Sequence, residues 1–186
     1  MRLSDDSYEY IKEEVVALFE EYNIKTIPIS GFELAHKMGL KIIPYSKFSE
    51  SKQERLIEID KDGFFTDYNG IETILFNDKA NSKRANMTIL HEIGHYVLGH
   101  TNMMNSEEAE AEAKFFAKYA SAPPVLIHLL KTKSAENIAC VFNLSDKASE
   151  IAFNYYQKWL KKREKEDFKL SEYEIKLWGA FKEEFK

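Results

Sequence analysis

The sequence has 186 residues, which is enough for one domain of ordinary size or for one domain with a helical extension. Apolar residues make up 44% and charged residues 31%, so the chain can bury a proper core. The net charge of −5 argues against broad electrostatic binding to nucleic acid, and no apolar run reaches the roughly 18 residues that a membrane-spanning helix needs.

The first half of the chain predicts a helix, a short helix and then a small sheet. Apolar residues recur at helical spacing between residues 8 and 22. Pro28 precedes a short helix, for which Gly39 is a plausible C-cap. Turn residues then separate three strand-like segments, which are 40–45, 55–60 and 72–77. We expect these segments to form a mostly antiparallel sheet of three to four strands.

From residue 81 onward the sequence predicts helices only. An apolar helix runs from a cap at Asn81 to about Gly99, and the next helix ends at Pro123. Further helices are expected at 125–131, 134–142 and 145–162, and a last one after a capping box that begins at Ser171. The order of helix, sheet and helices predicts an α+β fold in which the small sheet packs on a helical core. We divide the chain into a domain at 1–124 and a helical extension at 125–186 that packs on it.

The single cysteine and the first residues bear on the compartment. Cys140 is the only cysteine, so no intrachain disulfide can form, and its apolar surroundings predict a buried, inert thiol. The first ten residues lack the apolar segment of a signal peptide. We therefore expect a reducing, cytoplasmic location and no membrane partner.

The apolar segment 88–100 carries two histidines and a glutamate. His91 and His95 are four residues apart and share one face of a helix, where both imidazoles can reach one metal ion. Glu92 lies beside that point, where it can accept a proton from the water that attacks a substrate, as in the H-E-x-x-H motif. Burying three such groups without compensation would be costly, so we favour a zinc site over histidines of an ordinary core.

Two histidines do not complete a catalytic zinc site, which usually has three protein ligands. The helix after the next loop offers four candidates, which are Glu107, Glu108, Glu110 and Glu112. The first two lie in the first turn, where the helix dipole explains them. Glu110 and Glu112 lie deeper and differ by about 200° around the helix axis, so both cannot face the histidines. Helical geometry alone leaves the choice between them open.

The chain resembles the ImmA/IrrE family of bacterial and phage zinc metallopeptidases over about residues 20–125. The segments that carry the resemblance are "DGFF", "ILFN", an arginine (Arg84) ahead of the active helix, "LHEIGHYVLGH" and "EAEAKFFAKYASAP". The resemblance implies a zincin-like, gluzincin-type core with one zinc ion per chain. It further implies that His91, His95 and Glu110 are the zinc ligands and that Glu92 is the catalytic base. Glu112 is the alternative third ligand. Lys114 is a departure, because the family usually has asparagine or aspartate there.

These observations predict a zinc-dependent endopeptidase, and the resemblance implies a cytosolic regulatory substrate such as a transcriptional repressor. Glu92 would take a proton from the attacking water and pass it to the leaving amine. The strand at 73–76 is a candidate to pair with the extended substrate, and an ordinary internal strand is an equally favoured alternative. Tyr96 and Tyr119 are candidates for a second oxyanion donor, although a packing role is favoured for each. His100 is interpreted as a structural residue that faces away from the site.

Two other functions stay open, and both dispense with cleavage. One is a regulatory module that binds zinc, and the other is a DNA-binding repressor with a relic site. Residues 138–160 resemble a DNA-reading pair of helices, but packing explains most of their apolar residues, so we expect no nucleic acid partner. Glu92 argues against a relic, because metal binding does not need it but the chemistry does. The sequence gives no indication of the oligomeric state.

Overall fold

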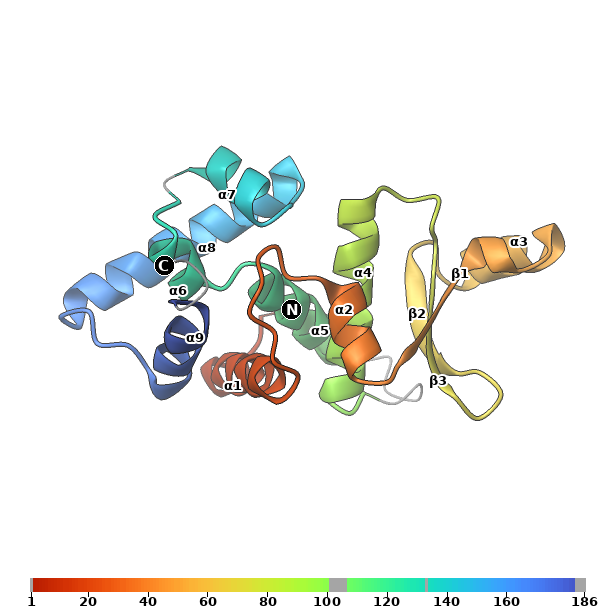
Figure 1. The fold of residues 1–186 in the computed structure, drawn as a ribbon, viewed down its shortest axis with the longest axis horizontal. Coiled ribbons are helices and arrows are strands. Elements are labelled where there is room, and N and C mark those ends of the chain that lie inside the picture. Colours follow the sequence, from red (N-terminus) through yellow and green to blue (C-terminus); the bar gives the residue numbers. More distant parts are fainter. Residues whose placement is uncertain (1, 101–106, 133, 183–186) are drawn as a thin grey trace. The chain divides into compact units, whose positions relative to one another are not determined.

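The computed structural model of the chain describes residues 2–100, 107–132 and 134–182 (Figure 1). The residues group into two compact units. The first contains Met1–Ile11 and Ser30–Ala117, and the second contains Lys12–Ile29 and Lys118–Lys186. Helix α1 (Asp5–Glu21) therefore contributes residues to both units. The predicted domain boundary after residue 124 stays a prediction.

The sheet of the first unit has three strands in the order β1–β3–β2. The strands are β1 (Lys41–Pro44), β2 (Gly63–Asp67) and β3 (Glu72–Phe76). β1 runs parallel to β3, with Ile42 opposite Ile74, whereas β2 runs antiparallel to β3, with Phe64 opposite Leu75. The α+β class is thus confirmed, and the sheet is mixed rather than mostly antiparallel, with three strands and not four.

The strand predicted at 55–60 is wrong, because most of this segment belongs to helix α3 (Glu50–Ile59). Short apolar runs fit the period of a strand and that of a helix, and here the strong helix formers at 50–55 extend the helix through the run. Leu56 is the buried residue of α3, and it packs with Tyr45 and Leu75. The second strand follows later in the chain, at Gly63–Asp67.

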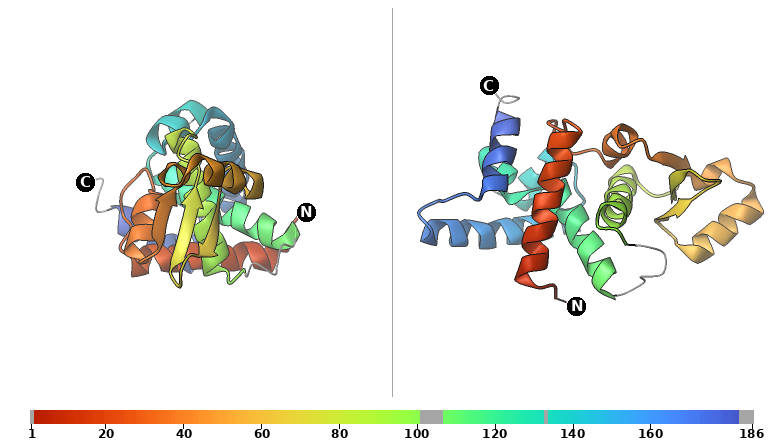
Figure 2. Two further views of the ribbon diagram at one scale, coloured as in Figure 1. Left: turned by 90° about the vertical axis from the view of Figure 1, so that its right-hand side faces the viewer. Right: turned by 90° about the horizontal axis from the view of Figure 1, so that it is seen from below.

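Helix α4 (Ser82–Val97) lies against one face of the sheet, while α3 lies on the other side (Figures 1 and 2). Asn81 caps α4 as predicted, because its side-chain oxygen accepts a hydrogen bond from the N–H of Arg84 at 3.0 Å. The helix contacts α2 (Gly31–Lys37), β2 and β3. Its apolar side chains with no exposed surface are Ile89, Leu90 and Ile93. Their burial holds α4 in a fixed rotation, which leaves the polar residues of its motif on another face.

Helix α5 (Glu107–Ser121) approaches α4 closely at Gly94. A Cβ atom at this position would lie 3.1 Å from Phe116, which has no exposed surface. Such a contact is tighter than ordinary van der Waals packing, so glycine permits the two helices to come together here. The close approach brings the first turns of α5 within reach of the motif on α4.

The second unit contains the predicted C-terminal helices, which are α6 (Pro124–Leu129), α7 (Ala135–Val141), α8 (Asp146–Lys165) and α9 (Glu172–Lys182). Glu174 accepts a hydrogen bond from the N–H of Ser171 at 2.8 Å, as the capping box predicts. Ile138 and Phe142 are buried, which supports packing over DNA reading for this segment. Cys140, by contrast, is exposed, so its predicted burial is wrong. Among the described helices, none combines the length and apolar character required to cross a membrane.

Candidate metal centre

Three side chains from two helices bring potential metal ligands together in the first unit. His91 and His95 lie one turn apart on α4, and their Nε2 atoms are 3.1 Å apart. Glu110 of α5 places Oε1 3.2 Å from Nε2 of His95 and Oε2 3.7 Å from Nε2 of His91. Tetrahedral zinc with bonds of about 2.0–2.1 Å requires ligand atoms roughly 3.3 Å apart. The two imidazoles and the carboxylate therefore fit a zinc ion in both chemistry and spacing.

The structure separates the two glutamates that helical spacing left open. Glu110 faces both histidines of the motif, whereas Oε2 of Glu112 lies 2.9 Å from Nε2 of His100. The expectation that His100 faces away from the site is wrong, because its Nδ1 lies 3.0 Å from Nδ1 of His95. Glu110 thus contacts both histidines of the motif, whereas Glu112 contacts His100, which in turn contacts His95.

Glu92 is buried beside the ligand group, with 6% of its surface exposed. Its Oε2 accepts a hydrogen bond from the backbone N–H of Phe65 in β2 at 2.9 Å. Burial raises the pKa of Glu92 to about 8, against the effect of the Phe65 hydrogen bond, which lowers it. A carboxyl group whose pKa lies near neutrality suits proton transfer in both directions.

The electrostatics of the ligand group favour neutral imidazoles, which is the form that binds metal. Burial and, to a smaller extent, the neighbouring His91 lower the pKa of His95 to about 4, although Glu110 opposes this effect. Burial also lowers the pKa of His91, although Glu110 opposes this effect. For Glu110, burial acts to raise the pKa, but His91, Lys114 and His95 together outweigh it and lower the pKa.

A cavity of about 740 Å³ opens over the ligand group, and β2 forms part of its wall. β2 is an edge strand, paired with β3 on one side. The N–H of Phe65 points to Glu92 and away from β3. Backbone groups alternate in direction along a strand, so Phe65 and every second residue from it direct their N–H and C=O groups to the outer edge of β2. β3 is paired on both sides, so residues 73–76 form the ordinary internal strand that was the alternative, and their suggested pairing with a substrate is wrong. Among the described residues, β2 is the strand with an unpaired edge at the cavity, apart from the N–H of Phe65, which bonds to Glu92.

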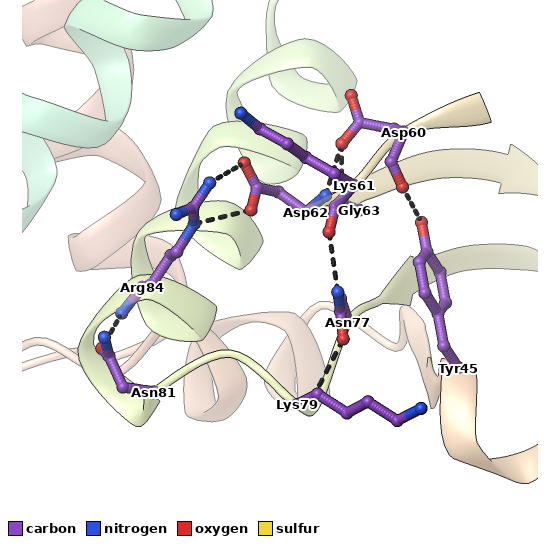
Figure 3. A network of polar contacts seen from close by, with 9 residues as sticks. All are labelled: Tyr45, Asp60, Lys61, Asp62, Gly63, Asn77, Lys79, Asn81 and Arg84. Carbon is purple, nitrogen blue, oxygen red and sulfur yellow. Dashed lines mark hydrogen bonds and ion pairs between the residues drawn. The ribbon is translucent and has the colours of Figure 1, made fainter. Parts of the chain in front are cut away.

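A polar network holds the start of β2 against α4 (Figure 3). The guanidinium of Arg84 donates two hydrogen bonds to the carboxylate of Asp62, at 2.6 and 2.8 Å. The carboxylate of Asp60 accepts a hydrogen bond from the N–H of Asp62 at 2.7 Å, and Asn77 donates to the carbonyl of Lys61 at 2.8 Å. Sequence reasoning noted Arg84 only through the resemblance, and the structure gives it a role in placing the edge strand.

The two tyrosines considered as oxyanion donors do not line the cavity. Tyr96 donates a hydrogen bond to the carboxylate of Glu72 at 2.9 Å, and Tyr119 is buried. Lys114, noted in the sequence only as a departure from the family, does line the cavity, and its Nζ lies 3.3 Å from Oε2 of Glu110. Sequence reasoning also missed the N–H of Phe65, because a backbone group leaves no signal in residue types.

A comparison with protein families gives a match over most of the chain. The model described as Peptidase_M78, IrrE N-terminal-like domain, matches residues 35–176. No curated protein matches the chain. The matched region contains the complete ligand group and extends well beyond residue 125, where the resemblance seen in the sequence ended. The family region therefore reaches from α2 into α9.

Proposed function

Because the chain belongs to the Peptidase_M78 family of IrrE N-terminal-like domains, we propose that it is a zinc-dependent endopeptidase. Its substrate is a cytosolic regulatory protein such as a transcriptional repressor. The observation that carries this proposal is the convergence of His91, His95 and Glu110, with the buried carboxyl group of Glu92 beside them. These residues line a cavity along an open strand edge, which supports a protein substrate in extended conformation.

The chain's own residues divide the chemistry between binding and proton transfer. His91, His95 and Glu110 would hold one zinc ion. When bound there, zinc would lower the pKa of a water ligand to about 7, polarise the peptide carbonyl and favour the ionised form of the neighbouring carboxyl group. Glu92 accepts the proton of the attacking water and later delivers it to the leaving amine. The hydrogen bond from the N–H of Phe65 holds Glu92 in position for both transfers.

The outward edge of β2 binds the substrate in this proposal. An extended peptide that pairs with β2 would run along the cavity wall, with its scissile bond over the ligand group. The ion pair between Arg84 and Asp62 keeps that edge at a fixed distance from α4. Lys114 is the cation of the wall that contacts Glu110, and it is available to neutralise negative charge that develops on the substrate.

The alternative of a zinc-binding regulator that does not cleave is less well supported. A structural metal site needs its ligands. It does not need an additional buried carboxyl group, such as that of Glu92, which lies beside the ligands without being one of them. Burial of Glu92 carries a free-energy cost that a structural site would avoid by using an apolar residue. The alternative of a DNA-binding module has the buried faces of α7 and α8 against it, together with the net charge of −5.

Co-expression tests the proposal. The chain and its Glu92→Gln variant are each produced together with the products of neighbouring genes, and intact masses of all partners are measured. We expect a partner that is shortened by the wild type and left whole by the variant. Shortening by both proteins would remove Glu92 from the mechanism. A partner that binds both proteins and is cut by neither would favour the non-cleaving regulator.

A further inference from the structure

Three side chains, those of His95, His100 and Glu112, contact one another in series between the ligand group and α5. Nδ1 of His95 lies 3.0 Å from Nδ1 of His100, and Nε2 of His100 lies 2.9 Å from Oε2 of Glu112. The side chain of His100 is 8% exposed and that of Glu112 is 22% exposed, so water competes little for these contacts. Neither His100 nor Glu112 belongs to the group that would hold the metal.

The end of α4 places the His100 ring. Gly99 has a φ of +69°, a left-handed conformation that glycine adopts without strain, and its N–H bonds to the carbonyl of Tyr96. The next N–H, that of His100, bonds to the carbonyl of His95 at 2.9 Å. The helix therefore ends in a left-handed turn at Gly99, and this turn brings the ring of His100 against the Nδ1 side of the His95 ring.

We propose that Glu112 and His100 are a positioning pair that fixes the tautomer of His95 and thereby leaves its Nε2 free to bind the metal. This inference rests on the proposed zinc site, and it concerns residues that the site itself does not include. It assigns Glu112 a role other than that of the reserve ligand which the sequence suggested.

The direction of the hydrogen bonds follows from what each group can donate. An ionised carboxylate only accepts, so His100 donates to Glu112 from Nε2. A neutral imidazole with its proton on Nε2 accepts at Nδ1, so His95 donates to His100 from its own Nδ1. Nε2 of His95 then carries a lone pair, and this is the atom that lies 3.2 Å from Oε1 of Glu110. The opposite direction would place a proton on the atom that has to bind zinc.

The pair also restrains the orientation of the ring. A histidine ligand that donates its second N–H to a fixed acceptor loses rotational freedom before the metal arrives. Glu112 and Glu110 both lie on α5. The same helix therefore supplies the carboxylate of Glu110 to the ligand group and that of Glu112 to His100. Removing the acceptor at Glu112 should therefore weaken zinc binding without removing any ligand.

Substitutions at Glu112 separate the acceptor from the charge. Glu112→Gln keeps a side-chain oxygen that can accept from His100, whereas Glu112→Met has similar size and no comparable acceptor. Glu108→Gln and Glu108→Met are matched controls, because Glu108 lies exposed on the same helix. Zn²⁺ affinity is measured for all five proteins by competition with a chelator. Long-range ¹H–¹⁵N correlation spectra of the wild type, with and without Zn²⁺, report which nitrogen of each imidazole carries a proton.

We expect Glu112→Met to weaken Zn²⁺ affinity by about 10- to 100-fold, as is usual when a partner of a metal ligand is lost. Glu112→Gln should stay close to the wild type, and both Glu108 variants should match it. The spectra should show the proton of His95 on Nδ1 and that of His100 on Nε2.

A folded Glu112→Met protein with wild-type affinity would overturn the inference, as would a proton on Nδ1 of His100. The spectra of the wild type decide the matter even if Glu112→Met fails to fold. The proposed function fails separately, if the wild type binds no Zn²⁺ at all. In that event the spectrum of the metal-free protein still shows the direction of the hydrogen bonds.

Discussion

The buried carboxyl group of Glu92 predicts a pH-dependent gain in stability when it is replaced by an amide. Burial raises the pKa of Glu92 from 4.5 to about 8 in the metal-free protein. In the unfolded chain the carboxyl group has its ordinary pKa and releases its proton well below pH 7. Between pH 4.5 and 8 the folded state therefore binds more protons than the unfolded state, so stability falls as the pH rises.

The size of the effect follows from the difference between these two pKa values. Each pH unit between them corresponds to about 1.4 kcal/mol of unfolding free energy, which gives about 3 kcal/mol by pH 7 and about 5 kcal/mol above pH 8. Glu92→Gln has no such dependence, because its amide stays neutral, and its oxygen can still accept from the N–H of Phe65. His91 and His95 titrate in both proteins, so their contributions cancel in the difference.

Urea denaturation in the presence of a chelator, from pH 5 to pH 9, measures the effect. We expect the two proteins to have similar stability near pH 5, and the variant to be more stable by about 3 kcal/mol at pH 7. Glu108→Gln, an exposed carboxylate on α5, should show no such divergence. Parallel stability curves for the wild type and Glu92→Gln would refute the reasoning, because they would mean that Glu92 ionises normally in the folded state.

Three further predictions concern the ligand group and the helices that carry it. The purified protein should contain about one zinc ion per chain, and His91→Ala or His95→Ala should lose most of it; a metal-free, folded wild type that cannot be reloaded would remove the site. Glu110→Gln should weaken Zn²⁺ binding by at least about ten-fold, and Glu112→Gln far less, in a chelator titration; the reverse order would exchange their roles. Gly94→Val should destabilise the protein by about 1–3 kcal/mol in urea, because its side chain would press on the ring that packs 3.1 Å away, and an unchanged midpoint would show that α4 and α5 separate easily.

Local spacing accounts for what the sequence predicted well. The pairing of His91 with His95 needs only the period of a helix, and the capping oxygen of Asn81 needs only its nearest neighbours. The choice between Glu110 and Glu112 depends on how α5 rotates against α4. That rotation depends on packing at Gly94, which no spacing rule contains. Glu110 as the third ligand therefore stays a prediction, which the observed distances support.

The errors have both distant and local causes. The order of the strands decides which edge is open, and a central β3 could not be inferred from the run at 72–76 alone. The segment 55–60 has the composition of either element, and its single buried side chain, Leu56, suffices for a helix. The contact of His100 with His95 depends on the left-handed conformation of Gly99. This residue ends the helix, so helical spacing no longer predicts the direction of the side chain that follows.

We propose that this chain hydrolyses peptide bonds with zinc and Glu92. The most direct measurement is the rate at which new N-termini appear in a library of peptides derived from a whole proteome. Zinc-loaded wild type should cut a defined set of peptides, a chelator should stop the cutting and added zinc should restore it. Glu92→Gln with the same zinc content should cut them about 10²- to 10⁴-fold more slowly, because it lacks the proton acceptor. Equal rates for the two zinc-loaded proteins, or no new N-termini from the wild type, would contradict the claim.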